Sequence, residues 1–175
     1  MPDTFEKLIA AIHEELKIPA VYATERKLVL QSECMNPVSA GTDIFEREAF
    51  MEEMALAAWR RMRTAALQDG VELQLVSAYR SVEYQKQLFL KKLKAGQRID
   101  EILKVNAAPG YSEHHSGRAL DLTCPDSACL EESFEDTAAF GWLESHAANY
   151  GFFMSFPRNN VHGLLYEPWH WCFND

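Results

Sequence analysis

The stretch Tyr111-Ser112-Glu113-His114-His115-Ser116-Gly117-Arg118-Ala119-Leu120-Asp121 brings adjacent imidazoles and two carboxylates together. Residues of the same kinds recur near the end of the chain, in Tyr166-Glu167-Pro168-Trp169-His170-Trp171. A catalytic zinc site takes three His or carboxylate ligands and leaves the fourth position for water, whose proton a nearby carboxylate can accept. The two stretches therefore offer His114, Asp121 and His170 as candidate metal ligands, and Glu167 as the candidate base.

The spacing within each stretch requires an irregular backbone. His114 and Asp121 are an odd number of positions apart, so an unbroken strand would send their side chains to opposite faces. Gly117 lies between them and is the residue best able to turn the chain. Glu167 and His170 in the second stretch are also an odd number of positions apart, so a regular strand would direct them to opposite faces. Pro168 lies between them, cannot donate a ladder hydrogen bond and favours a bend. We therefore expect turns at both places.

Length and composition indicate an ordinary globular domain. A chain of 175 residues can bury about two-thirds of its unfolded surface in one core. Hydrophobic residues make up 47% and charged residues 25%, which argues against disorder. The net charge of −9, from 17 basic and 26 acidic residues, argues against a generic surface for nucleic acid or anionic membranes. An anionic ligand must therefore meet local positive charge.

The beginning of the chain carries no recognisable targeting signal. The longest apolar run in residues 1–17 is Leu8 to Ile12, which is too short for a signal-peptide core or a spanning helix. The sequence as it stands predicts a cytoplasmic protein without membrane insertion. A leader removed from the natural chain would instead place it in the periplasm or outside the cell.

The four cysteines show no CxxC spacing, which argues against a thiolate zinc site or a redox motif; they are Cys34, Cys124, Cys129 and Cys172. In a reducing compartment all four are expected as free thiols. Cys124 and Cys129 are close enough in sequence to pair if the protein is exported.

Hydrophobic periodicity predicts alternating helices and short strands. Helices are expected over 5–16, 44–68, 82–95, 100–107 and 134–150, and strands over 27–30, 71–75, 119–122, 151–154 and 164–173. Loops are expected over 19–42, apart from the short strand, and over 123–131 and 157–163. Arg80 and Gln85 flank the start of one helix, which Ser81 can cap, so both can point toward one pocket.

Four motifs follow one another between about residues 70 and 173. They are Ser77-Ala78-Tyr79-Arg80-Ser81 with Gln85, Ser112-x-His114-x-x-Gly117-x-Ala119-x-Asp121, Tyr150-Gly151-Phe152, and Glu167-Pro168-Trp169-His170. A single His-x6-Asp spacing is common by chance, whereas four motifs in order are far more specific. With them the chain resembles the zinc D-alanyl-D-alanine carboxypeptidases and dipeptidases, which include the vancomycin-resistance D,D-peptidases.

The resemblance assigns a role to each matching position. It implies one zinc ion per chain, held by His114, Asp121 and His170, with Glu167 as the catalytic base. Arg80 matches the arginine that stabilises the tetrahedral intermediate, a role that suits a permanently charged fork. Gln85 and Ser112 match groups that engage the carboxyl-terminal end of the substrate.

Three positions are not settled by these motifs. On residue chemistry alone either His114 or its neighbour His115 could chelate, and the family pattern selects His114. Ser155 stands where many relatives have an arginine before an aromatic residue and proline. After Trp169-His170 the chain continues with Trp171-Cys172, where in relatives an arginine often follows. These departures leave the zinc core intact and affect the details of substrate binding.

The resemblance implies an α+β fold, with a small, mainly antiparallel sheet carrying the zinc site and helices packed mostly on one side. We expect residues 1–175 to form one zinc peptidase domain, with a helical part over 1–69 and the zinc-site core over 70–175. The expected activity is removal of a terminal D-Ala from peptidoglycan stem peptides or D-Ala-D-Ala-type precursors. The alternatives are an L-alanyl-D-glutamate-type cell-wall endopeptidase and a non-catalytic zinc-stabilised binding module like that of Hedgehog signalling domains. The oligomeric state and the choice between D,D and L,D bonds stay open.

Overall fold

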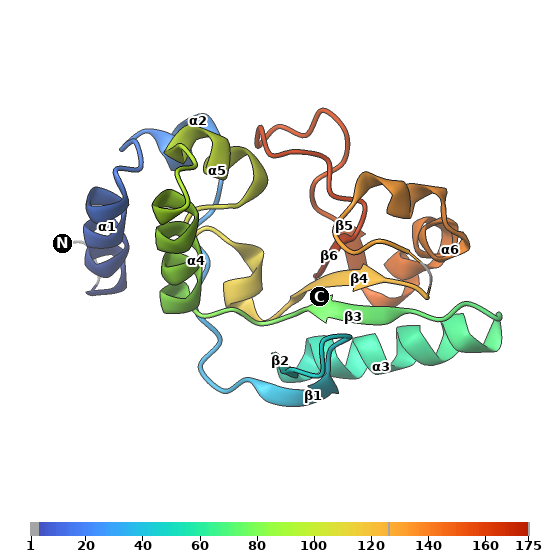
Figure 1. Ribbon diagram of the computed structural model, residues 1–175. Helices are drawn as coiled ribbons and strands as arrows, with labels where there is room; N and C mark the ends of the chain where they lie inside the picture. The colour runs from blue at the N-terminus through green and yellow to red at the C-terminus, as the bar shows by residue number, and fades with distance from the viewer. Residues whose placement is uncertain (1–3, 126, 175) are drawn as a thin grey trace.

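A four-stranded antiparallel sheet lies at the centre of the computed structural model, which describes residues 4–125 and 127–174 (Figure 1). Its strands are ordered β3-β4-β6-β5, with bounds Gln74–Ser77 for β3, Ala119–Thr123 for β4, His170–Phe173 for β6 and Phe152–Met154 for β5. In the ladders Asp121 pairs with Ser77 on one side and with His170 on the other. Two candidate ligands therefore lie directly opposite each other on neighbouring strands.

One face of this sheet packs on two helices, α3 (Glu53–Gln68) and α6 (Ala138–His146). Leu120 and Leu122 of β4 lie in a common core with Trp59 and Met62 of α3 and Leu143 of α6. Since side chains alternate along a strand, Asp121 points to the opposite face. A hairpin of β1 (Val38–Thr42) and β2 (Glu48–Met51) adds to this part of the molecule, called here the sheet lobe.

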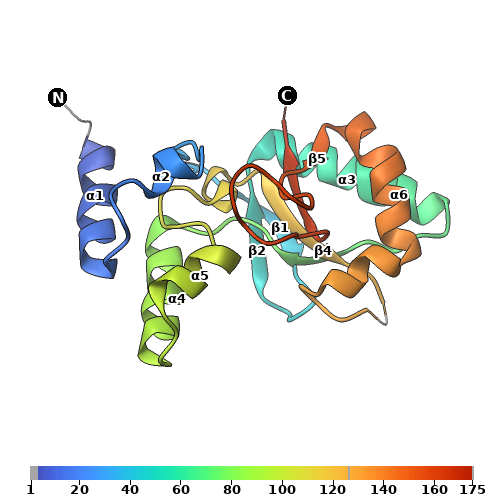
Figure 2. The same ribbon diagram turned by 90° about the horizontal axis from the view of Figure 1, so that it is seen from above.

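Four further helices form a second group, called here the helical lobe: α1 (Thr4–Leu16), α2 (Tyr22–Glu25), α4 (Val82–Lys94) and α5 (Ile99–Val105). They have a core of their own, which includes Ile12, Leu16, Phe89 and Ile102. Both views show this lobe beside the sheet lobe rather than over its helices (Figures 1 and 2). The chain between β5 and β6 joins the lobes, because the amide of Leu165 donates to the carbonyl of Lys104.

Three short 3-10 helices complete the described secondary structure: η1 (Glu113–Ser116), η2 (Glu132–Asp136) and η3 (Ala147–Tyr150). Gly117 ends η1 with φ of 72°, in the left-handed region that glycine adopts without strain. A Cβ at this position would lie 2.8 Å from the backbone nitrogen of Glu52. The turn predicted between His114 and Asp121 is therefore present, and close packing requires glycine there.

The α+β architecture is confirmed, and so are the helices predicted at 5–16, 82–95 and 100–107. The predicted helix at 44–68 is wrong at its start, because residues 48–51 form β2 and Glu52 caps α3 by accepting from the amide of Ala55 at 3.0 Å. Ala49 and Met51 are buried and Glu48 is exposed. This two-residue alternation was hidden by the helical stripe that continues after it.

Several other predicted boundaries are corrected. The strand at 27–30 is not formed, and the loop predicted around it contains α2 and β1. The strand predicted at 71–75 begins only at Gln74. The last strand begins at His170 rather than at 164, since the chain before it forms turns and irregular backbone. The helix at 134–150 is divided into the end of η2, α6 and η3. The predicted loop at 123–131 includes Asp126, which lies outside the described residues.

The four cysteines carry free thiols. Among the described residues, no helix combines the length and the apolar character that crossing a membrane requires.

Candidate metal centre

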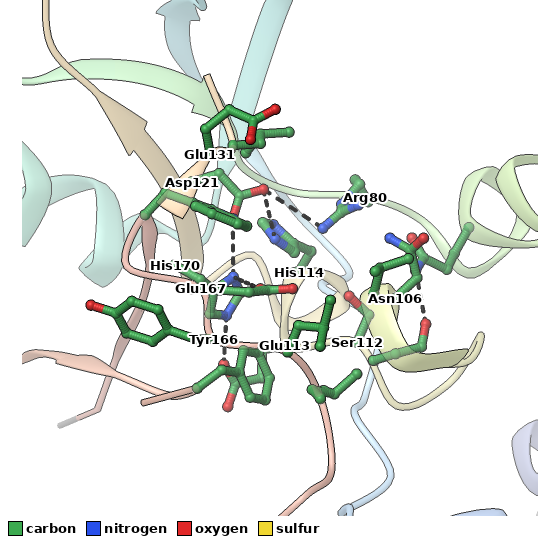
Figure 3. Close-up of a pocket in the computed structure, with 18 of the residues that line it drawn as sticks. Arg80, Asn106, Ser112, Glu113, His114, Asp121, Glu131, Tyr166, Glu167 and His170 are labelled. Atoms are coloured by element: carbon green, nitrogen blue, oxygen red, sulfur yellow. Dashed lines mark hydrogen bonds and ion pairs between the residues drawn. The ribbon is translucent and has the colours of Figure 1, made fainter. Parts of the chain in front are cut away.

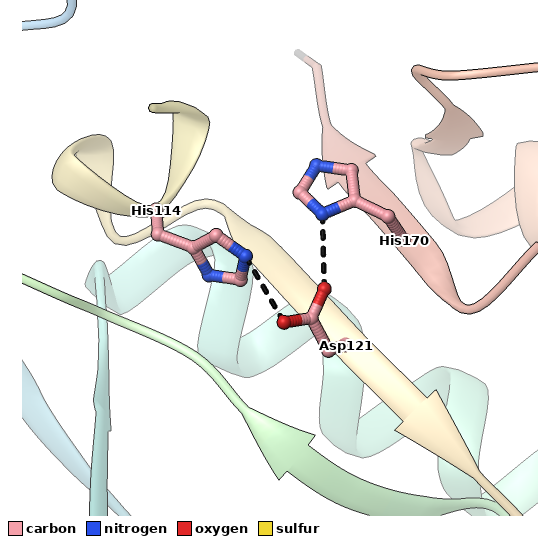
Figure 4. Close-up of side chains that lie close together, drawn as sticks. All are labelled: His114, Asp121 and His170. Atoms are coloured by element: carbon pink, nitrogen blue, oxygen red, sulfur yellow. Dashed lines mark hydrogen bonds and ion pairs between the residues drawn. The ribbon is translucent and has the colours of Figure 1, made fainter. Parts of the chain in front are cut away.

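Three buried side chains from separate segments meet on the open face of the sheet (Figure 4). Asp121 comes from β4, His170 from β6 and His114 from η1. Asp121 Oδ1 lies 3.0 Å from His170 Nδ1, and its Oδ2 lies 3.2 Å from His114 Nε2. All three candidate ligand atoms lie within 4.8 Å of one another. The structure therefore brings the predicted ligands together.

The contact between His114 and Asp121 lacks a proton. Nδ1–H of His114 donates to the carbonyl of Ala78 at 2.6 Å, so Nε2 carries a lone pair. Burial and the charge of Arg80 lower the pKa of His114 to about 4, which keeps the ring neutral. Nε2 is buried without a hydrogen-bond partner and faces a carboxylate oxygen. Two facing acceptors in a buried site need a cation between them, and the donor set suits zinc.

The neighbouring His115 is occupied at both ring nitrogens. Its Nδ1–H donates to the carbonyl of Arg80 at 2.7 Å, and its Nε2 accepts from the amide of Gly110 at 3.1 Å. No ring nitrogen of His115 is left to bind a metal. The structure thus selects His114 on physical grounds, a choice that residue chemistry alone left open.

His170 lies between two carboxylates. Nδ1 faces Asp121, and Nε2–H donates to Oε2 of Glu113 at 2.9 Å. Although burial opposes it, these two carboxylates raise the pKa of His170 to about 10. Sequence reasoning missed Glu113, because its partner is far along the chain and the contact depends on how η1 meets β6.

Glu167 lies beside the three candidate ligands, at the turn before β6. One of its carboxylate oxygens lies 3.9 Å from Nδ1 of His170, and the side chain is 14% exposed. Burial raises the pKa of Glu167 to about 7, to which the negative charge of Asp121 also contributes. A carboxylate with such a pKa can both take and return a proton near neutral pH.

The other predicted residues line the same cavity, of about 360 Å³ (Figure 3). Arg80 lies 3.8 Å from Asp121 and keeps a buried Nε without a partner. Gln85 donates to the carbonyl of Ala107 at 2.9 Å, and its Oε1 is also buried without a partner. Ser112 is buried in the wall. Unpaired polar atoms here are available to a ligand.

Lys92 is a cavity residue that the sequence analysis overlooked. Its ammonium donates to Oδ1 of Asn106, and no carboxylate of the described residues forms an ion pair with it. Burial and the charge of Arg80 lower the pKa of Lys92. Because the spacing from Gln85 to Lys92 is two helical turns, both lie on the same face of α4. Glu131 and Tyr166 lie on the other side of the three ligands (Figure 3).

Comparisons with known proteins agree with this geometry. The family model for VanY, D-alanyl-D-alanine carboxypeptidase, matches residues 48–175. YodJ of Bacillus subtilis (strain 168) is 31% identical over 170 residues, which cover 94% of this chain and 59% of YodJ. The chain thus spans less than two-thirds of this relative.

Two solved structures share the fold. The LD-carboxypeptidase LdcB aligns with a TM-score of 0.73 and 31% identity, over 82% of this chain and 70% of LdcB. The vancomycin-resistance D,D-pentapeptidase VanY from a VanB-type cassette, solved in complex with Zn(II), aligns with a TM-score of 0.60 and 25% identity. That alignment covers 85% of this chain and 88% of VanY.

Proposed function

The chain belongs to the VanY D-alanyl-D-alanine carboxypeptidase family, and on this premise we propose that it is a zinc-dependent carboxypeptidase of peptidoglycan stem peptides or their precursors. The observation that supports the proposal most directly is the pair of buried acceptors, His114 Nε2 and Asp121 Oδ2, which face each other at 3.2 Å. A cation held there with His170 stands beside a carboxylate suited to proton transfer. The proposed catalytic unit is a single domain over residues 1–175.

Each residue around the cavity has a defined task in this reaction. His114, Asp121 and His170 would hold the zinc, which when bound would supply Lewis-acid activation of the scissile carbonyl and of the attacking water. Glu167 accepts the proton from that water and returns it to the leaving amine. The guanidinium of Arg80 donates to the oxygen that becomes negative as the carbonyl carbon turns tetrahedral. The proton balance closes on Glu167, which ends the cycle as a carboxylate.

The helical side of the cavity accounts for the choice of a terminal bond. Lys92 and Arg80 place two positive charges there, in a protein whose net charge is −9. The free Oε1 of Gln85 and the hydroxyl of Ser112 add neutral polar groups. We assign the carboxyl-terminal end of the substrate to this side, since a free carboxylate is stabilised by such a set.

The test is digestion of purified muropeptides with the zinc-loaded protein, followed by mass spectrometry, with and without chelator. Loss of one carboxyl-terminal residue that stops with chelator supports the proposal. Cleavage within the stem would instead establish an endopeptidase. A protein that binds zinc tightly and cleaves no muropeptide would be a binding module.

An L,D-carboxypeptidase is the second candidate, and the likeness to LdcB, with a TM-score of 0.73, favours it. Pentapeptide and tetrapeptide stems separate the two specificities, because the first ends in a D,D bond and the second in an L,D bond. The initial rates on the two stems, measured with one protein preparation, decide between them.

A further inference from the structure

The two candidate histidine ligands are oriented by different kinds of group. His114 donates from Nδ1 to a backbone carbonyl, that of Ala78. His170 donates from Nε2 to the side chain of Glu113, at 2.9 Å. This bond leaves from the ring nitrogen that does not face Asp121, and therefore from the side of the imidazole away from the ligand cluster (Figure 3).

The Glu113 carboxylate is itself held in place. Its Oε2 accepts from the hydroxyl of Ser155 at 2.6 Å, and its backbone carbonyl accepts from the hydroxyl of Ser116 at 2.6 Å. The thiol of Cys172 lies next to it, and burial together with the Glu113 charge raises the pKa of that thiol. Glu113 therefore ties η1 to β6 and to the chain after β5.

We propose that Glu113 is a positioning residue for the metal ligand His170, whose Nε2–H it holds so that Nδ1 is directed toward Asp121 and the metal. The inference rests on the proposed zinc site. A carboxylate behind a ligating imidazole fixes the ring orientation and the tautomer, and it raises the basicity of the ligating nitrogen. With a metal bound at Nδ1, Nε2 would keep its proton and go on donating it to Glu113.

Glu113 acts through His170 rather than on the substrate. Its Oε2 is engaged by both His170 and Ser155, and Glu167 lies on the Nδ1 side of the ring instead. The two glutamates therefore lie at different nitrogens of the His170 ring, Glu113 at Nε2 and Glu167 near Nδ1. Loss of Glu113 is expected to weaken metal binding, whereas loss of Glu167 is expected to leave it unchanged.

The experiment compares E113A, E113Q and S155A with the wild type, using zinc affinity from chelator competition. The matched control is E131A, which removes the same charge from the exposed rim of the same cavity. E113A is expected to bind zinc about 10–100-fold more weakly. E113Q keeps an acceptor for Nε2–H, so its zinc affinity should fall much less. The zinc affinity of S155A should lie between those of the wild type and E113A, and that of E131A should equal the wild-type value.

A second readout follows the tautomer directly. In the zinc-loaded wild type, 15N-labelled His170 should show a protonated Nε2 in slow exchange with water, and E113A should lose this protection. Equal zinc affinity and the same His170 signal in E113A and wild type would overturn the inference while leaving the zinc site standing. If E113A does not fold, a wild-type His170 signal and full zinc affinity in both E113Q and S155A would overturn it. A wild type that does not bind zinc would instead overturn the proposed function.

Discussion

The sheet lobe and the helical lobe meet at one cavity but supply it in different ways. The sheet lobe brings Asp121 and His170 together through strand register, since the two residues pair directly across β4 and β6. The helical lobe supplies Gln85 and Lys92 as side chains projecting from one helix, α4. A position set by ladder hydrogen bonds cannot shift without breaking the sheet, whereas a side chain on a helix face can be exchanged. We infer that the first lobe sets the reaction and the second sets the substrate.

The largest expected effect is on the reaction side, in Glu167→Gln. The amide cannot accept a proton from water, so turnover should fall roughly 10²–10⁴-fold. Zinc content should remain that of the wild type, because the proposed ligands His114, Asp121 and His170 are unchanged. Steady-state release of the terminal residue and metal analysis of the same sample measure both. Hydrolysis at the wild-type rate would remove Glu167 from the role of base.

Arg80 lies between the two lobes, in the connection from β3 to α4. Arg80→Ala is expected to have the second-largest effect on turnover. Removing an oxyanion donor should lower kcat by about 10²–10³-fold, with zinc still bound. Arg80→Lys keeps the charge but not the planar fork, and should recover only part of the loss. Full turnover in the alanine variant would show that the charge develops elsewhere.

Lys92 tests the helical side alone. Lys92→Gln should raise KM roughly tenfold, the size expected when a charged hydrogen bond to the substrate is lost, with kcat little changed. Lys94→Gln, which removes an exposed charge from the same helix, is the matched control. The sharpest version uses stem peptides with a free or an amidated carboxyl terminus. A loss of equal size on both peptides would mean that Lys92 does not bind the carboxylate.

The smallest expected effect concerns the helix ends, one in each lobe. Ser81 caps α4 by accepting from the amide of Tyr84 at 3.0 Å, and Thr137 caps α6 by accepting from the amide of Phe140 at 3.2 Å. Alanine at either position should lower the free energy of unfolding by about 1 kcal/mol, as measured by urea denaturation. Zinc affinity should be unchanged in both. A cap loss in α4 that also weakened zinc binding would contradict the division between the lobes.

The sequence predicted best what local spacing determines. The cap at Ser81 and the turn at Gly117 follow from the properties of single residues, and both are found. The strand β2 was missed because Ala49 and Met51 precede a helix whose apolar stripe extends the same pattern. Tertiary packing, rather than propensity, separated the two elements.

Within the site, the missed residues share one cause. Glu113 acts by meeting His170, which is 57 positions away, and Lys92 acts because α4 faces the cavity. No spacing rule connects such pairs, since their proximity arises only when the lobes are assembled. His115 shows the converse case, because its two hydrogen bonds exclude it from the metal set although its residue type and position permit it.

The pairing of Arg80 with η1 has a further consequence for how substrate binding could change in this fold. The amide of Arg80 donates to the carbonyl of His114, and its own carbonyl accepts from the ring of His115. Both peptide groups that flank this residue are thereby hydrogen-bonded to the segment that carries the candidate ligand His114. If the proposed function holds, mutations that reshape α4 could alter which substrate is accepted while leaving Arg80 in place beside Asp121. Substrate specificity could therefore change in such a fold while the arrangement of Arg80 and His114 stays the same.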